Sequence, residues 1–269
     1  MSYISFHRKM KKIFTLSSIF GFNPSKFVES ISNTPFYFRD LQKIKAQYDL
    51  SGKEFPFGKP YPCLSDRYDS SGTAQGHYFH QDLLVARKVF SNNPYVHLDV
   101  GSRVDGFISH VASYRLVKVI DIRSLSNTIT NIEFIQADMM GSLPVSLYNS
   151  CDSLSCLHAL EHFGLGRYGD PVKYNGYLLG LENLYNLLSP QGKFYFSVPI
   201  GPQRLEFNAH RVFSILYIIE LFKNKYRIDS FSYVDDKGDL HENVEFSSDD
   251  IANNYGCHYG CGIFEMTKF

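Results

Sequence analysis

From about residue 94 onward the sequence alternates short apolar runs with helical stretches, and this pattern limits the fold more than any other feature. Five apolar runs have the length of buried strands: residues 95–100, 117–121, 132–135, 152–157 and 194–198. Apolar residues recur at helical spacing over 105–114 and again over 178–188, before Ser189-Pro190-Gln191-Gly192 end the second helix. Such alternation predicts an α/β domain with a parallel, doubly wound sheet.

The end of the chain follows a different pattern. Residues 228–234 and a run near 261–267 read as two strands, and a turn at 235–238 follows the first without an obvious crossover helix. Two late strands joined in this way predict an antiparallel last strand. We therefore expect a Rossmann-like, mostly parallel seven-stranded sheet with an antiparallel last strand, preceded by a helical N-terminal extension.

Charge is distributed unevenly along the 269 residues. The whole chain carries 27 Lys and Arg against 27 Asp and Glu, which gives no reason to expect a nucleic-acid partner. Residues 1–60 alone carry ten basic against four acidic residues and several Phe. We expect residues 1–60 to form a basic, aromatic-rich helical extension and 61–269 to form the Rossmann-like domain. No apolar run approaches the roughly 18 residues of a membrane span.

Five cysteines, an odd number without dense spacing, predict a reducing, cytoplasmic setting. The basic residues 8–12 precede a short apolar stretch that resembles a signal peptide, but Ser17, Ser18 and Gly21 interrupt it and no cleavage site follows convincingly. For residues 1–25 we consider an interfacial helix that would place the protein at the inner face of the membrane. The alternatives are a lid over the substrate and a helical pair that forms a homodimer.

A cofactor site is expected at the first strand-to-helix turn, residues 99–106, because ligands of such sheets lie beyond the carboxyl ends of the strands. Gly101 lets the backbone approach a ligand closely. Asp121, 20 residues past Gly101, can accept hydrogen bonds from two ribose hydroxyls, and Asp138 can contact an adenine amino group. The dinucleotide fingerprint Gly-x-Gly-x-x-Gly is absent.

An acid at position 99 suits the amino group of a methionine moiety better than a pyrophosphate. Together with Asp121, Asp138 and the two late strands, it favours S-adenosylmethionine as the cofactor; the alternative is the same fold without a cofactor. The residues that we expect to bind the cofactor around this turn and the next strand ends are Asp99, Gly101, Ser102, Gly106, Asp121, Ile122, Asp138, Met139, Leu157 and His158.

Residues 94–200 resemble the core of class I S-adenosylmethionine-dependent methyltransferases in the ordered segments HLDVGSRVDGF, VIDIR, IQADM, SLSCLHALEHFG and LSPQGKFYFSVP. More narrowly, the segments PFYFRD, SDRYDSSGTAQGHYFHQDLLVA, HALEHFGLGRYGDP and NAHRVFS are similar to an uncharacterised bacterial methyltransferase-like family, from about residue 20 to the end. Members of that family are similar to proteins of surface-polysaccharide gene clusters. The chain departs from the usual methyltransferase turn at Arg103, where a glycine is common.

The resemblance implies further site residues. Tyr78 and Gln81 would bind the methionine carboxylate of the cofactor, with an aromatic helix start packed on the sheet as the alternative reading. His162, His210 and Glu161 are the candidate catalytic residues, and a structural role for His210 is equally open. Arg67, Arg167 and Arg211 could hold a phosphate or carboxylate of the acceptor.

The resemblance also implies the acceptor, a sugar of a bacterial surface glycan, presented as the glycan, a nucleotide sugar or a lipid-linked sugar. Transfer of the activated methyl group needs proximity and alignment, and an alcohol acceptor also needs a base. We therefore expect O-methylation. A second reading is a catalytically inactive, methyltransferase-like scaffolding subunit of a glycan-assembly complex.

Two clusters raise the question of a metal. His158, Glu161 and His162 match H-x-x-E-H, the pattern of a metal-dependent hydrolase in which both histidines share one face of a helix. Their place directly after a predicted strand argues against that reading. Cys257 and Cys261 could be half of a zinc site, but no second pair with ligand spacing follows, so we interpret them as packing residues. We predict no metal ligand, and a divalent metal is the less favoured alternative.

Overall fold

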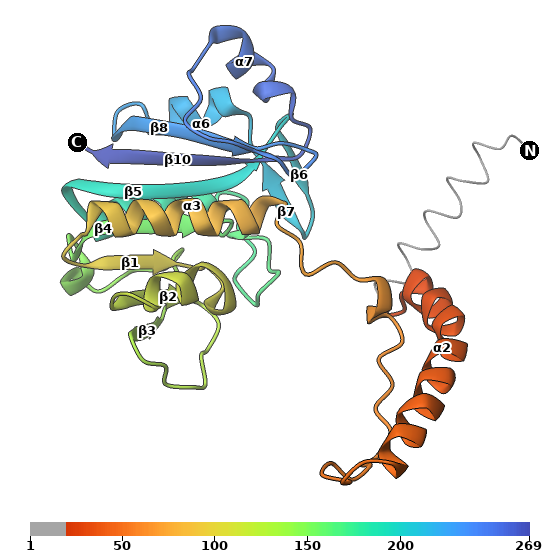
Figure 1. The fold of residues 1–269 in the computed structure, drawn as a ribbon. Coiled ribbons are helices and arrows are strands. Elements are labelled where there is room, and N and C mark those ends of the chain that lie inside the picture. The colour runs from red at the N-terminus through yellow and green to blue at the C-terminus, as the bar shows by residue number, and fades with distance from the viewer. Residues whose placement is uncertain (1–19) are drawn as a thin grey trace, which may run out of the picture. The chain divides into compact units, whose positions relative to one another are not determined.

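The computed structural model describes residues 20–269 (Figure 1). They form two compact units, and the boundary lies between Thr73 and Ala74. Among the described residues, no helix combines the length and apolarity that crossing a membrane would require. The expected interfacial helix in residues 1–25 falls mainly on residues outside the described part of the chain.

The N-terminal unit is built on one long helix, α2 (Pro24–Asp49). Asn23 caps it by accepting a hydrogen bond from the backbone N–H of Lys26 at 3.2 Å. The buried Asn33 donates to the backbone carbonyl of Leu64 at 2.8 Å, which ties the returning chain to the helix. Because α2 has little else to pack against within this unit, most of its apolar side chains stay exposed.

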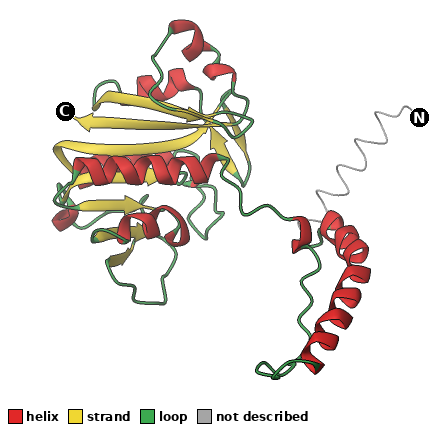
Figure 2. Cartoon of the chain, viewed as in Figure 1, coloured by secondary structure: helices red, strands yellow, loops and turns green. Residues whose placement is uncertain are grey.

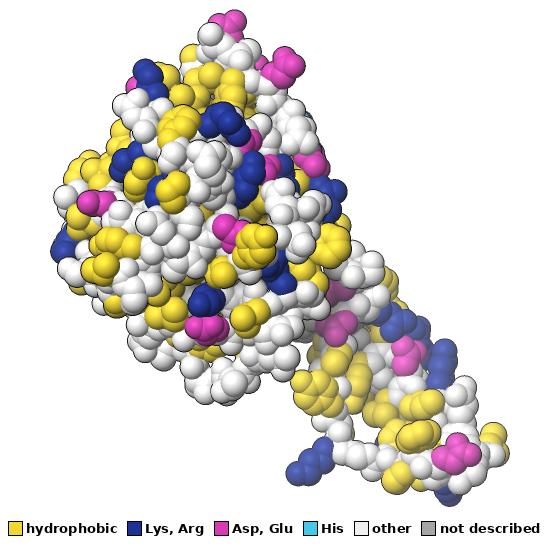
Figure 3. Space-filling view, turned by 90° about the vertical axis from the view of Figure 1, so that its left-hand side faces the viewer, with side chains coloured by type: hydrophobic (Ala, Val, Ile, Leu, Met, Phe, Trp, Pro, Cys, Tyr) yellow, Lys and Arg dark blue, Asp and Glu magenta, His cyan; other side chains and the backbone are white. Residues whose placement is uncertain are grey.

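Hydrophobic side chains therefore gather on the surface of the N-terminal unit, together with lysines and arginines (Figure 3). The exposed apolar residues of this unit include Phe20, Phe27, Val28, Ile31, Phe38, Leu50, Phe55 and Tyr61. Isolated exposed apolar residues are ordinary, but a set of this size on one helix and its return loop is not.

The C-terminal unit is an eight-stranded sheet with helices on both faces (Figure 2). Its strands run in the order β3-β2-β1-β4-β5-β10-β8-β9. Their bounds are β1 His97–Val100, β2 Val117–Asp121, β3 Ile132–Gln136, β4 Cys151–Leu157, β5 Leu188–Ile200, β8 Tyr226–Val234, β9 Leu240–His241 and β10 Gly260–Lys268. A separate hairpin is formed by β6 (Arg204–Glu206) and β7 (His210–Val212).

The sheet confirms the fold class expected from the sequence. β1 to β5 pair in parallel, and β10 is antiparallel to both neighbours, β5 and β8. The expected count of seven strands is one short, because the two-residue β9 adds an edge partner to β8. The strand order reverses between β1 and β4, which is where doubly wound sheets bind their ligands.

The helices of this unit are α3 (His77–Asn92), α4 (Ser109–Ala112), α5 (Gly176–Leu187), α6 (Ile215–Phe222) and α7 (Ser248–Ala252). A π-helical turn, Val104–Ile108, runs directly into α4. Leu84 of α3 and Val111 of α4 pack on one face of the sheet, where Figure 1 shows α3 lying alongside β4 and β5 and running in about the same direction. Leu184 of α5 and Ile218 of α6 pack on the other face.

Alternation along β1 explains how one strand supplies both faces. Leu98 and Val100 belong to the core beneath α5 and α6. His97 and Asp99 point to the opposite face, where they contact Phe107 and Ser102 respectively. Successive strand residues point to opposite faces, so an apolar run of this length contributes to two cores and can still place polar side chains in the interior.

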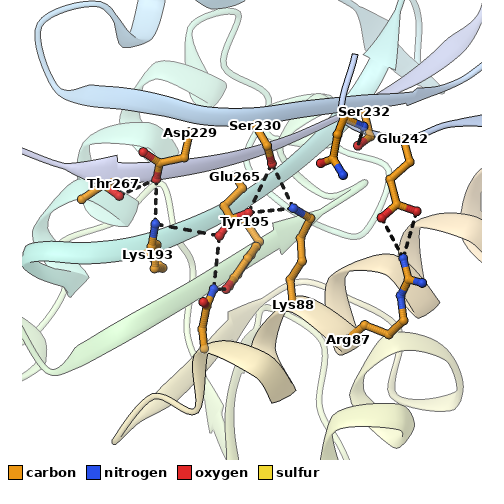
Figure 4. Close-up of polar contacts among 12 residues, drawn as sticks. Arg87, Lys88, Lys193, Tyr195, Asp229, Ser230, Ser232, Glu242, Glu265 and Thr267 are labelled. Atoms are coloured by element: carbon orange, nitrogen blue, oxygen red, sulfur yellow. Dashed lines mark hydrogen bonds and ion pairs between the residues drawn. The ribbon is translucent and has the colours of Figure 1, made fainter. Parts of the chain in front are cut away.

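A polar network joins α3 to the antiparallel half of the sheet (Figure 4). Lys88 of α3 donates to Glu265 of β10 at 2.7 Å and to Ser230 of β8 at 2.9 Å. Asn92 donates to the second oxygen of Glu265 at 3.1 Å. These contacts hold the C-terminal end of α3 against β8 and β10.

The segment after α5 differs in detail from the expected loop. The helix ends at Leu187, as predicted, but residues 189–192 belong to β5 rather than to a separate turn. Cys151 pairs with Leu188, and Ser153 pairs with Lys193, so four residues of β5 lie opposite one residue of β4 and the ladder is interrupted by a bulge. Pro190 and Gly192 therefore follow the end of the helix but lie within β5, in the part of the strand that bulges.

Candidate functional site

The turn after β1 brings the backbone close to the neighbouring β4 edge. Gly101 has φ +78°, and a Cβ at this position would lie 2.8 Å from the Cβ of Ala159. Only glycine fits both the left-handed conformation and the close approach. The turn that the sequence predicts as a cofactor loop is therefore held tightly against the end of β4.

Asp99 organises this turn from below. One of its oxygens accepts the backbone N–H of Ser102 at 3.0 Å, and the other accepts the Ser102 hydroxyl at 2.7 Å and also the hydroxyl of Ser155. The side chain is fully buried. Burial raises the pKa of Asp99 to about 7, although the serine hydrogen bonds oppose the shift. Asp99 therefore supports the turn after β1 and lies behind the cavity wall, not on its surface.

Gly106 lies where the π-helical turn bends. Its backbone angles, φ −122° and ψ −117°, are not helical, and an added Cβ would come within 2.8 Å of the Asp82 carboxylate. Arg103, the departure from the usual glycine, pairs with Asp105 at 2.6 Å, and both side chains are exposed. The Arg103 side chain folds outward, and its residue still contributes to the rim of the cavity.

Asp121 and Asp138 follow β2 and β3 at the same edge of the sheet. The Asp121 carboxylate accepts the backbone N–H of Arg123 at 2.8 Å and pairs with the Arg123 guanidinium at 2.6 Å. Asp138 accepts the backbone N–H of Met140 at 2.8 Å through one oxygen. Both aspartates line one cavity, in the order expected for a ribose and an adenine along the strand ends.

That cavity has a volume of about 540 Å³ and opens at the β1–β4 switch point. Small-molecule sites fall in this size range. The predicted site residues that line it are Tyr78, Gln81, Gly101, Ser102, Asp121, Ile122, Asp138, Met139, Leu157, His158, His162 and Arg167. Asp99, Gly106 and Glu161 lie behind the lining as supports.

Helix α3 supplies Tyr78 and Gln81. The Gln81 side chain is buried and engaged, because its amide donates to Asp82 at 2.9 Å and its oxygen accepts the Ser197 hydroxyl. The Tyr78 side chain is exposed, and its ring lies 5.2 Å from the ring of His158 between centroids. Of the two, Tyr78 has the free polar atom that a ligand could reach.

His158 and Glu161 form a buried pair after β4. His158 Nδ1 lies 2.8 Å from Glu161 Oε1, and both side chains are almost wholly buried. Burial raises the pKa of Glu161, but the facing His158 outweighs it, so the pKa stays below its usual value. Burial lowers the pKa of His158, whereas Cys261 and Glu161 raise it, with a net result of about 10.

His162 is held in one orientation. Its Nδ1 lies 2.6 Å from the carbonyl oxygen of Ala209, which places the proton on Nδ1 and leaves the Nε2 lone pair free. Nε2 is 3.7 Å from the Glu161 carboxylate. Burial lowers the pKa of His162, so the ring is neutral near pH 7 and can accept a proton.

This geometry also corrects the helix expected under the hydrolase reading. His158 has φ +48° and lies in the segment after β4, whereas His162 ends a short 3-10 turn, Leu160–His162. The two rings do not share the face of one α-helix. Glu161 is bonded to His158 instead of being free to act on a water molecule.

The remaining predicted residues lie apart from the cavity or at its edge. Arg167 lines it and donates to the Ala209 carbonyl at 3.1 Å. Arg211 is buried and donates to the carbonyls of Phe163 at 2.7 Å and Tyr174 at 2.9 Å, so its guanidinium is used within the fold. His210 pairs with Glu206 at 3.1 Å on the β6–β7 hairpin, outside the lining. Arg67 belongs to the N-terminal unit, where it pairs with Asp40 at 2.9 Å.

A family model matches residues 112–255, which is more than half of the chain; the family is DUF268, described as a Caenorhabditis protein of unknown function. The chain belongs to the DUF268 family. The match covers β2 to β9 and includes the His158–Glu161–His162 segment, but it begins after the Gly101 turn. A comparison of this DUF268 chain with curated proteins finds no match.

Several solved structures are similar to the DUF268 chain at low identity. The 1,6-didemethyltoxoflavin-N1-methyltransferase of Burkholderia thailandensis, with bound S-adenosylhomocysteine, is 15% identical (TM-score 0.49) and covers 70% of this chain and 78% of that one. The N-methyltransferase NodS of Bradyrhizobium japonicum WM9, in complex with S-adenosylhomocysteine, is 12% identical (TM-score 0.46) and covers 72% and 88%. The cyclase SpnF is 14% identical (TM-score 0.49) and covers 70% and 80%.

The lining residues of this DUF268 chain that were not singled out from the sequence include Asp82, Arg123, Tyr168 and Asp170. Arg123 could have been found, because it comes two residues after Asp121 at a strand end. Asp170 organises the loop before α5 by accepting the backbone N–H groups of Gly164 at 2.9 Å and Gly166 at 3.2 Å. Nothing in the local sequence signals that this loop returns to the cavity wall.

Proposed function

We propose that the cavity binds S-adenosylmethionine and that the chain transfers its methyl group to an acceptor. One observation carries the proposal: the Gly101 turn, Asp121 and Asp138 stand at the ends of three neighbouring strands and line a single cavity of about 540 Å³. The glycine turn suits the methionine part, Asp121 the ribose hydroxyls and Asp138 the adenine.

The charge of the lining supports a cationic ligand. Five aspartates line the cavity against three arginines. Arg103 and Arg123 are each paired with an aspartate, Asp105 and Asp121, so their charges are largely balanced. A sulfonium cofactor carries positive charge at its reactive centre, which acidic surroundings favour. When bound, this cofactor supplies an activated methyl group.

The protein's own part in such a transfer is to hold the acceptor in line and to take its proton. His162 is the residue with the geometry for the second task, because the Ala209 carbonyl fixes its Nδ1 proton and leaves Nε2 as an acceptor at the cavity wall. His210 lies on the hairpin, with its Nε2 facing Glu206. Glu161 keeps His158 oriented through the buried pair and does not reach the cavity surface.

For the acceptor we propose a hydroxyl of a bacterial surface glycan or of its nucleotide-sugar or lipid-linked precursor. The sequence resemblance is the support for this part. Arg167 adds a chemical argument, because a guanidinium at the cavity wall beside the Tyr168 ring can hold a phosphate or carboxylate of such an acceptor.

Methyl transfer can be tested with S-adenosylmethionine that carries a tritiated methyl group, offered with nucleotide sugars and lipid-linked glycans. The wild-type protein should label an acceptor. His162→Gln should lower kcat by at least about 100-fold and leave the cofactor Kd unchanged, because it removes a general base. His241→Gln, at the distant β9 edge, should label at the wild-type rate. Loss of labelling in His210→Gln but not in His162→Gln would contradict the assignment of the base.

A second candidate is a cofactor-binding subunit without turnover. The observation in its favour is that several polar groups of the site are already used within the protein: Gln81 bonds Asp82 and Ser197, and Asp121 bonds Arg123. Cofactor binding with no labelled product from any of the offered acceptors would favour this candidate.

A further inference from the structure

Three potential metal ligands from distant parts of the chain meet beside the cavity. They are His77, the first residue of α3, His158, in the segment after β4, and Cys261, in β10. One ligand atom from each of the three lies within 4.8 Å of the other two. The three residues are more than 80 positions apart in the sequence, so no ligand-spacing motif predicts the cluster.

His158 is oriented as metal-binding histidines are. Its Nδ1 is bonded to the buried Glu161 carboxylate at 2.8 Å, and its Nε2 is buried without a hydrogen-bond partner. The residue as a whole is 8% exposed. A buried nitrogen left without a partner is costly, and a carboxylate on the opposite ring nitrogen is the usual support of a metal-bound imidazole.

The backbone of His158 is held in an uncommon conformation. Its φ of +48° lies in the left-handed region, and its N–H donates to the Ser197 carbonyl at 3.0 Å. Such conformations persist where the surrounding structure holds them, and they cluster at functional sites. Here the conformation presents the imidazole to Cys261 and His77.

Cys261 and His77 complete the set. Cys261 is fully buried, and its sulfur lies within 4.8 Å of a ring nitrogen of His158, 3.8 Å from Gln81 Oε1 and 4.0 Å from the Gly262 carbonyl oxygen. The His77 ring stacks on that of His158, with 5.3 Å between centroids, and is only partly buried. The cluster is thus closed on the Cys261 side and more open at His77.

We propose that His77, His158 and Cys261 bind one Zn²⁺ ion. Two imidazoles and a thiolate are ligands that zinc prefers, and three protein ligands leave a fourth position for water or a substrate atom. Coordination requires a cysteine thiolate and neutral imidazoles, so zinc binding depends on pH. His158 also lines the cavity, so the ion lies at its wall.

The proposed site differs from both zinc patterns considered in the sequence. His162 and Glu161 are not ligands, because Glu161 supports His158 and His162 is bonded to Ala209. Cys261 is a ligand, whereas Cys257 is not part of the cluster. Cys261 is thus assigned as a zinc ligand and not, as the sequence suggested, as a packing residue.

The test measures zinc in the full-length protein. The protein is stripped with a chelator, reloaded with zinc sulfate, freed of loose metal and analysed by plasma mass spectrometry. We expect one zinc per chain in the wild type and in Cys257→Ser, and loss of that zinc in Cys261→Ser and His77→Gln. Glu161→Gln should weaken zinc affinity by about 10–100-fold, since Glu161 acts through His158.

Cobalt provides a second readout. Loading with Co²⁺ should give a thiolate-to-cobalt charge-transfer band that is absent in Cys261→Ser and present in Cys257→Ser. If Cys261→Ser fails to fold, as judged by circular dichroism, the more exposed His77→Gln decides. Zinc retained in both Cys261→Ser and His77→Gln, or zinc absent from the reloaded wild type, would each overturn the proposal. The site does not rest on the proposed methyl transfer: Asp121→Ala should retain its zinc whatever its cofactor affinity.

Discussion

At the scale of single residues, the site depends on a few positions where the backbone leaves no room for alternatives. Gly101 combines a positive φ of +78° with a neighbour 2.8 Å from its would-be Cβ. Gly169 has nearly the same φ, +80°, but nothing lies within 4 Å of its would-be Cβ. Alanine substitutions at Gly101 and Gly169 therefore share the backbone strain, and only the one at Gly101 adds a steric clash.

Gly101→Ala should lower the free energy of unfolding by about 1–3 kcal/mol more than Gly169→Ala does, because only the first adds a clash with Ala159 to the strained conformation. Urea denaturation of the two variants measures the difference. Equal losses of stability in both would show that the close approach of the turn to β4 is not as described.

Two buried groups on β1 give opposite pH dependences. Burial lowers the pKa of His97 to about 3, and Arg115 lowers it further while Asp152 opposes the shift. Burial raises the pKa of Asp99 to about 7, and the facing Asp82 adds to this. Between about pH 4 and 6.5 the unfolded chain holds the extra proton at His97 and the folded chain holds it at Asp99. Their effects on stability cancel in the wild type.

Removing one of the two groups should leave the pH dependence of the free energy of unfolding that the other causes. In Asp99→Asn the free energy of unfolding should rise with pH between about 4 and 6.5, relative to wild type, by up to about 1.4 kcal/mol per pH unit. In His97→Asn it should fall with pH over the same range. Denaturation curves at half-unit pH steps measure both slopes. Variants whose curves run parallel to the wild type would rule out these buried titrations.

The sequence predicts the place of a single residue only where a local pattern, such as the end of a strand, determines it. Asp121 and Asp138 could be placed at the cavity because Asp121 ends one recognisable strand and Asp138 comes two residues after the next. The supporting position of Asp99 could not be foreseen, since it depends on Ser155 from a strand more than 50 residues away. The cluster of His77, His158 and Cys261 has the same origin, because it exists only once three elements are packed.

At the scale of elements, α3 is the helix that connects the cavity to the antiparallel half of the sheet. Lys88 and Glu265, 19% and 13% exposed, form an ion pair that two hydrogen-bonding side chains, Ser230 and Asn92, complete (Figure 4). The neighbouring pair of Arg87 and Glu242 is 65% and 38% exposed. Adjacent residues of one helix thus make a shielded and a solvated ion pair.

Lys88→Met should lower the free energy of unfolding by about 2 kcal/mol, because Glu265 then keeps its charge with fewer partners in a largely buried place. Arg87→Met should change it by less than about 1 kcal/mol, since exposed ion pairs contribute little. The double variant Lys88→Met with Glu265→Gln should recover part of the loss. Equal effects at positions 87 and 88 in chemical denaturation would contradict the role given to the network.

Element order was the part of the fold most accessible from the sequence. The strand and helix periods, with Pro and Gly at the end of α5, predicted the parallel sheet and its antiparallel last strand. The pattern gave no sign of β9 or of the β6–β7 hairpin, since strands of two and three residues are too short to show a period.

At the scale of the whole molecule, the chain combines an N-terminal unit with many exposed apolar side chains and a C-terminal unit that contains the entire cavity. Every lining residue belongs to the second unit, so the account of the cofactor rests on that unit alone. Residues 1–60, which belong to the first unit, carry ten Lys and Arg against four Asp and Glu, whereas the aspartates of the cavity all belong to the second unit.

The central claim is that this cavity binds S-adenosylmethionine with Asp121 on the ribose. Titration calorimetry of the full-length protein with S-adenosylhomocysteine tests it most directly. The account predicts one site per chain, at least tenfold weaker binding in Asp121→Ala, and unchanged binding in Glu133→Ala, which removes a carboxylate from β3 outside the lining. No binding by the wild type, or equal affinity in Asp121→Ala and the wild type, would contradict it.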